Sequence, residues 1–188
     1  MDFCRKYTAI VILILITSTL LASPARAAER EFDEYDVKAY TIYNLAKFIE
    51  WPENSLNAAS TVTIYIIGDD PFKTFRDAMR DKSIQGKAIV IKNINSPADI
   101  KDVGILFISR SEKEHLQNIL KDISRLPVLT VGDTQSFAAR GVMINFYIEN
   151  SKIRFEINME SAKMAGLKIS SNLLRMGKII APPTRKEE

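Results

Sequence analysis

Three short polar strings contain the residue types most able to do chemistry. They occupy residues 68–70, 109–111 and 132–134, and each follows an apolar run that predicts a β-strand. In a parallel sheet, ligand crevices lie beyond the carboxyl ends of the strands. One residue from each string is therefore a candidate contact for a small polar ligand: Asp70, Ser109 and Asp133.

The same strings also have a purely structural explanation. Asp70, Ser111 and Asp133 or Thr134 stand where predicted helices begin, and the first N–H groups of a helix need capping by such side chains. Capping and ligand binding both remain open on the sequence alone.

The motifs of common enzyme classes are missing from the sequence. It contains no G-x-S-x-G, no glycine-rich phosphate loop and no H-E-x-x-H. The single histidine, His115, has no carboxylate placed by sequence to orient it. A metal-assisted hydrolase would depend on Asp69, Asp70 and Asp133, which is a sparse ligand set. We therefore predict a protein that is not an enzyme and uses no cofactor or metal.

The N-terminus has the pattern of a secretory signal peptide. Arg5 and Lys6 precede an apolar run, residues 7–22, and Ala25-Arg26-Ala27 gives a small-x-small cleavage site. We assign residues 1–28 to a cleaved signal peptide and predict a periplasmic protein.

Charge and cysteine content bear on two questions, whether the protein binds nucleic acid and whether it forms disulfides. The signal region holds three of the 26 basic residues and one of the 23 acidic residues, so the remaining chain is nearly neutral. Such a balance does not favour nucleic-acid binding. The one cysteine, Cys4, lies inside the signal, so we expect no disulfide after cleavage.

The rest of the chain alternates between strand and helix patterns. Strands are predicted at 61–67, 87–91, 104–108 and 128–131, followed by a hairpin of 142–148 and 153–158. Helices are predicted from Asp33 or Glu34 to Glu50 and at 72–79, 97–100, 112–124, 159–165 and 170–180, with Ser111 and Glu114 as a capping box and 53–60 as a polar loop.

This alternation predicts an α/β fold. It is typical of parallel strands joined by right-handed crossovers, and the hairpin adds an antiparallel part. We expect a single three-layer domain at 29–180, with a mixed, mostly parallel sheet, helices on both faces and a C-terminal β-hairpin. Residues 181–188 form a tail expected to fray.

The first predicted helix carries more apolar residues than one face can hold. Tyr35, Ala39 and Ile42 follow one helical stripe, but Val37 and Tyr40 lie off it. The surplus is explained either by burial under later segments or by contact with a subunit or partner. The candidate contact residues at this helix and its end are Tyr40, Phe48, Trp51 and Pro52.

Six strings across this region resemble one known family, the YfiR-like proteins of the periplasm. They are residues 43–52, 67–72, 129–133, 141–146, 154–158 and 165–174. The resemblance implies a non-enzymatic regulator that forms a homodimer, represses an inner-membrane diguanylate cyclase or a sensor kinase through its periplasmic sensor part, and is itself sequestered by an outer-membrane lipoprotein. The alternative is a small-molecule receptor that uses the strand-end crevice. Members described with disulfides differ from this chain, which has no cysteine outside the signal.

Overall fold

The structure is a computed structural model that describes residues 24–72, 75–79 and 81–180. Most of the expected signal peptide, residues 1–23, and the expected tail, 181–188, lie outside the described residues. Residues from Tyr35 onward form one compact unit, and the chain before it belongs to a separate unit. Within the described part, no helix combines the length and apolar character needed to cross a membrane.

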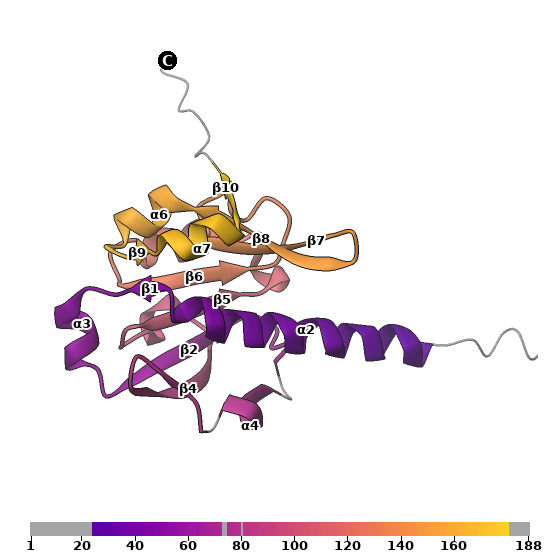
Figure 1. Cartoon of the computed structure of the whole chain (residues 1–188), viewed down its shortest axis with the longest axis horizontal. Coiled ribbons are helices and arrows are strands. Elements are labelled where there is room, and N and C mark those ends of the chain that lie inside the picture. The colour runs from indigo at the N-terminus through magenta and orange to yellow at the C-terminus, as the bar shows by residue number, and fades with distance from the viewer. Residues whose placement is uncertain (1–23, 73–74, 80, 181–188) are drawn as a thin grey trace, which may run out of the picture. The chain divides into compact units, whose positions relative to one another are not determined.

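Among the described residues, the main sheet has eight strands in the order β10-β8-β7-β6-β5-β2-β4-β3. Figure 1 labels all of these strands except β3. Their bounds are β2 Thr61–Ile67, β3 Ser83–Ile84, β4 Lys87–Ile94, β5 Gly104–Ile108, β6 Val128–Gly132, β7 Ile144–Glu149, β8 Lys152–Asn158 and β10 Lys178–Ile180. Strands β4, β2, β5, β6 and β7 run parallel to one another, and β10 pairs parallel with β8. Strand β3 pairs antiparallel with β4, and β8 pairs antiparallel with β7. The sheet is therefore mixed and mostly parallel, as the sequence predicts.

Helices and a small second sheet complete the unit, which includes α2 only from Tyr35 onward. The helices are α2 Pro24–Ala46, α3 Glu53–Ala58, α4 Phe75–Met79, α5 Leu116–Asp122, α6 Met159–Met164 and α7 Ser171–Met176, with 3-10 turns η1 Pro97–Asp99 and η2 Arg110–Glu112. The second sheet pairs β1 Ile49–Glu50 with β9 Lys168–Ile169.

Two hydrophobic cores lie on opposite faces of the main sheet. Alternate residues of β5 show this division, because Ile105 and Phe107 join the core under α2, whereas Leu106 and Ile108 join the core under α5. Helices therefore cover both faces, which confirms the predicted three-layer α/β arrangement.

Glycine allows a close strand contact at the centre of this sheet. A Cβ atom placed on Gly104 would lie 2.0 Å from the carbonyl oxygen of Thr63 in β2. Such a distance is far below any tolerated contact, so β2 and β5 meet here only because residue 104 has no side chain.

The hairpin and its following helix match the prediction closely. Asn150 and Ser151 both have positive φ, 50° and 58°, as a two-residue hairpin turn requires. The Asn158 side chain then caps α6 by accepting a hydrogen bond from the Ser161 N–H at 3.0 Å.

Several predicted boundaries are wrong because tertiary pairing overrides local pattern. The first helix ends at Ala46 instead of Glu50, since Ile49 and Glu50 pair with β9. Residues 53–58, predicted as loop, form α3. The last helix ends at Met176, because Lys178–Ile180 adds a strand parallel to β8.

The predicted capping box at Ser111 and Glu114 does not form. Residues 110–112 make a 3-10 turn, and α5 begins only at Leu116 without a side-chain cap. The Ser111 hydroxyl instead accepts a hydrogen bond from the Asp69 N–H at 3.0 Å. This serine therefore joins the ends of β2 and β5.

Candidate functional site

The three candidate ligand residues lie at the ends of neighbouring strands. Asp70 follows β2, Ser109 follows β5 and Asp133 follows β6, and these strands are adjacent in the sheet. The parallel arrangement brings all three to the same edge, as the sequence predicts. What the sequence does not predict is the partner that each side chain takes within the fold.

Asp70 belongs to a closed polar cluster with α4 and β4. Its Oδ2 lies 2.6 Å from Arg76 Nη2 and accepts a hydrogen bond from Asn93 Nδ2 at 3.2 Å. Its Oδ1 accepts the Phe72 N–H at 2.8 Å. Arg76 is held further by hydrogen bonds to Asn93 Oδ1 and to the Ile91 carbonyl. The side chain of Asp70 is only 8% exposed, so these contacts use most of its surface.

These contacts change the acidity of Asp70. Burial by itself would raise the pKa of the carboxyl group. The hydrogen bonds from Arg76 and from the Phe72 N–H, with a further one from Asn93, outweigh burial and lower the pKa below its ordinary value. Asp70 is therefore a structural carboxylate that stays ionised at neutral pH.

Ser109 ties the ends of β2 and β5 together. Its N–H donates to the Ile67 carbonyl at 3.1 Å, and its hydroxyl donates to the Asp69 carbonyl. The residue is 4% exposed. Both polar groups are thus used within the fold, and the hydroxyl is directed at backbone.

Asp133 forms a buried ion pair with a residue of the first helix. Lys38 Nζ lies 2.7 Å from Asp133 Oδ2, and the two side chains are 5% and 2% exposed. The ammonium group also lies 4.3 Å from the centre of the Tyr35 ring, a favourable cation–π distance. This pair attaches α2 to the carboxyl end of β6.

The strand ends therefore form a self-paired polar layer. Asp70 and Asp133 each have a cation from another element, and Ser109 is bonded to backbone. Within the ranges that the structure describes, no three His, Cys, Asp or Glu side chains gather as metal ligands would. This arrangement stabilises the docking of α2 and α4 and offers little for a reacting substrate.

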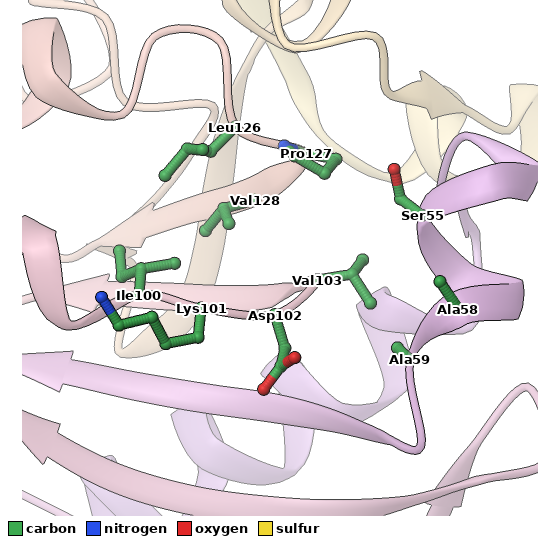
Figure 2. A pocket seen from close by; sticks show the side chains of 10 residues that line it. All are labelled: Ser55, Ala58, Ala59, Ile100, Lys101, Asp102, Val103, Leu126, Pro127 and Val128. Atoms are coloured by element: carbon green, nitrogen blue, oxygen red, sulfur yellow. The ribbon is translucent and has the colours of Figure 1, made fainter.

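One pocket lies at the opposite edge of the sheet, where β2, β5 and β6 begin. Figure 2 shows Ser55, Ala58 and Ala59 on one side and residues 126–128 across from them. Its volume is about 260 Å³. The N–H groups of Lys101 and Asp102 at its wall both donate to the Tyr65 hydroxyl, at 3.3 and 3.1 Å. These donors are therefore already used inside the protein.

The four candidate contact residues in and after the first helix differ in how far they are exposed to solvent. Tyr40 is 46% exposed and packs edge-on against Phe75 of α4, with ring centres 5.4 Å apart. Trp51 is 5% exposed and belongs to the core, while Phe48 and Pro52 are half-buried. The role of these four residues in binding stays a prediction. The part of this region that a partner could reach is Tyr40 together with Val37, which is 51% exposed.

Lys38 is the residue of this region that sequence reasoning missed. It lies between Tyr35 and Ala39 and one turn before Ile42, inside the stripe that packs on the sheet. A lysine within an apolar stripe could have indicated a buried ion pair, because such a charge needs a partner when it is buried. A strand-end carboxylate such as Asp133 was the natural candidate.

Residues 35–178 match the family model described as YfiR/HmsC-like, which is most of the chain. The chain belongs to the YfiR/HmsC-like family. Members of this family are periplasmic regulators of diguanylate cyclases and are regulatory rather than catalytic. The matched range contains both the Lys38–Asp133 pair and the exposed residues of α2.

Comparison with individual proteins adds little to the family match. A solved structure of a conserved domain protein from Vibrio cholerae O1 biovar El Tor is similar, with 12% identity and a TM-score of 0.46. The match covers 68% of this chain and 56% of that one, so this chain spans little more than half of that protein's length. With so low a TM-score, the likeness supports no conclusion about function. No curated protein matches the sequence.

Proposed function

We propose that this protein is a non-enzymatic periplasmic regulator, which binds the periplasmic sensor part of an inner-membrane signalling protein and represses its output. Membership of the YfiR/HmsC-like family over residues 35–178 carries this proposal. The client is a diguanylate cyclase or a sensor kinase, and an outer-membrane lipoprotein sequesters the regulator. The protein acts as a homodimer, and residues 1–28 are a signal peptide that directs its export to the periplasm and is then cleaved.

The chemistry of the strand ends supports a binding role over a catalytic one. A catalytic carboxylate needs access to substrate, but Asp70 is engaged by Arg76 and Asp133 by Lys38. The same engagement argues against the alternative, a small-molecule receptor at this edge, because a ligand would have to displace these pairs first.

The contact surface that we propose is the exposed side of α2 around Val37 and Tyr40. These two residues are 51% and 46% exposed and lie one turn apart. Aromatic residues at the centre of an interface often contribute most of its binding energy. The Lys38–Asp133 pair holds the opposite side of the same turn, which fixes the direction in which Val37 and Tyr40 point.

The experiment combines deletion and surface substitution in the host bacterium. Deletion of the gene raises cyclic di-GMP or kinase output if the protein represses such a client. Val37→Asp and Tyr40→Ala should reproduce the deletion at normal protein levels. Ile148→Asp is the matched control, since Ile148 is 57% exposed on the β7–β8 hairpin, outside this surface.

Two results would count against these proposals, the first against the regulatory function and the second against the contact surface. One is unchanged cyclic di-GMP and kinase output after deletion, together with no inner-membrane sensor recovered by the tagged protein from solubilised membranes. The other is equal repression by the wild type, Val37→Asp and Tyr40→Ala proteins, which would refute the contact surface alone. Thermal-shift screening with nucleotides and amino acids tests the receptor alternative, because a ligand of the folded state raises the melting temperature.

A further inference from the structure

A second pocket of about 260 Å³ lies between α5 and α6, away from the strand ends discussed above. One wall is α5, which contributes Gln117, Leu120 and Lys121, and the other is α6, which contributes Ser161 and Met164. The remaining lining residues are Ile123, Ser124, Thr130, Arg140, Gly141 and Met143. We refer to it as the α5–α6 groove.

The inner surface of the groove is mainly apolar. Ile123 and Met143 are 4% and 6% exposed, and Leu120 is half-buried beside them. Thr130 is 1% exposed, and its hydroxyl oxygen accepts the Met143 N–H at 2.9 Å. Methionine side chains adapt their shape to aliphatic ligands, so Met143 and the 66% exposed Met164 suit an alkyl chain.

The rim of the groove is positively charged. Lys121 is exposed and Arg140 is half-exposed, and none of the lining residues is an aspartate or a glutamate. Arg140 Nη1 donates to the Lys113 carbonyl at 3.1 Å, and the Arg140 carbonyl accepts from Gln117 Nε2 at 3.0 Å. The first bond holds the guanidinium group against the segment before α5, and the second fixes the Arg140 backbone against α5.

We propose that the α5–α6 groove binds a small amphipathic carboxylate, with its alkyl chain on Leu120, Met143 and Met164 and its carboxylate at Lys121 and Arg140. The volume of about 260 Å³ sets the size of the ligand. At roughly 30 Å³ for each water-sized group, this volume corresponds to about nine such groups, close to the size of a medium-chain acid. This site is independent of the contact surface on α2, so the two proposals stand or fall separately.

Octanoate is the direct probe. The purified protein is labelled at the methionine methyl groups and titrated with octanoate, octan-1-ol and octylamine in parallel NMR experiments. Octanoate should shift the Met143 and Met164 methyl signals saturably and leave that of Met79, buried under α2, in place. The alcohol should bind about tenfold more weakly because it lacks the charge, and the amine should not bind.

Two variants test the geometry. Lys121→Glu should weaken octanoate binding about tenfold or more, whereas Arg125→Glu, an equal charge change at an exposed residue outside the groove, should not. Ser124→Trp should block the groove by filling its rim. Equal binding of acid and alcohol, octanoate binding unaffected by Lys121→Glu, or the absence of a saturable shift would each overturn the proposal. Shifts caused by an acidic amphipathic peptide, with none caused by octanoate, would also overturn it by identifying a peptide groove.

Discussion

Lys38 and Asp133 form an ion pair that joins the first helix to the sheet across 95 residues of sequence. The two atoms lie 2.7 Å apart, and both side chains are almost fully buried. Taking two charges out of water is expensive, and their attraction offsets this cost only while both partners are present. The pair therefore makes the position of α2 depend on one specific contact.

Removing one partner of the Lys38–Asp133 pair should lower the stability of the folded protein. We predict that Lys38→Met lowers the free energy of unfolding by about 3 kcal/mol, because Asp133 would be left buried and unpaired. The double variant Lys38→Met/Asp133→Leu should recover most of this loss. Urea unfolding measures all three proteins. Lys47→Met, at an exposed residue in the turn that follows α2, should change stability by less than about 0.5 kcal/mol. Equal losses in the single and double variants would show that the pair is not coupled.

Asp70 should make stability sensitive to acid. Its folded-state pKa lies below the unfolded value of about 3.9, so its contribution is fully present above that pH. The contribution is lost as the pH falls through the folded pKa. We expect Asp70→Asn to cost about 2 kcal/mol at pH 7 and progressively less below about pH 4.

The control for this pH dependence is Asp69→Asn. Asp69 is exposed next to Asp70, and its backbone groups, rather than its side chain, bond to Ser109 and Ser111. Its substitution should leave the pH profile unchanged. A difference between wild type and Asp70→Asn that stays constant from pH 7 to pH 2 would contradict our assignment.

Tyr40 and Trp51 should give opposite results in binding and folding assays. Tyr40→Ala should weaken association with the client or second copy by about 2 kcal/mol, if the ring is central to the interface. Trp51→Ala should instead lower the free energy of unfolding by about 4 kcal/mol, because the side chain is 5% exposed in the core. Trp51→Phe should be much milder, since the indole nitrogen has no hydrogen-bond partner among the described residues. Weakened association in a fully stable Trp51→Ala protein would reverse these roles.

Asn158 connects three parts of the fold through one side chain. Its Oδ1 caps α6, and its Nδ2 donates to the Ala138 carbonyl at 2.8 Å. We predict that Asn158→Ala destabilises the protein by about 2 kcal/mol, more than the roughly 1 kcal/mol expected for Ser170→Ala at the cap of α7. Asn158→Asp keeps the cap but loses the Nδ2 donor, so it should be no better than alanine. Thermal and urea unfolding of the three variants distinguish capping from the link to Ala138.

The sequence predicted those parts of the fold that depend on local pattern. The strands at 61–67 and 104–108 are found at the predicted bounds, since continuous β-branched and apolar runs favour buried strands wherever they lie. The Asn158 cap was also predictable, because a cap needs only residues three positions apart. The strand-end placement of Asp70, Ser109 and Asp133 followed from the α/β alternation.

Partnerships between distant segments were decided by tertiary structure alone. Local periodicity extended the first helix to Glu50, but Ile49 and Glu50 gain strand partners in β9 that only the folded chain provides. In the same way, Lys178 leaves the predicted last helix to pair alongside β8. The candidate crevice became a self-paired layer because Lys38 and Arg76 reach its carboxylates from helices whose position no local rule specifies. The sequence determined which residues lie at the strand ends. The packing of α2 and α4 determined that the two strand-end carboxylates form ion pairs that stabilise the fold.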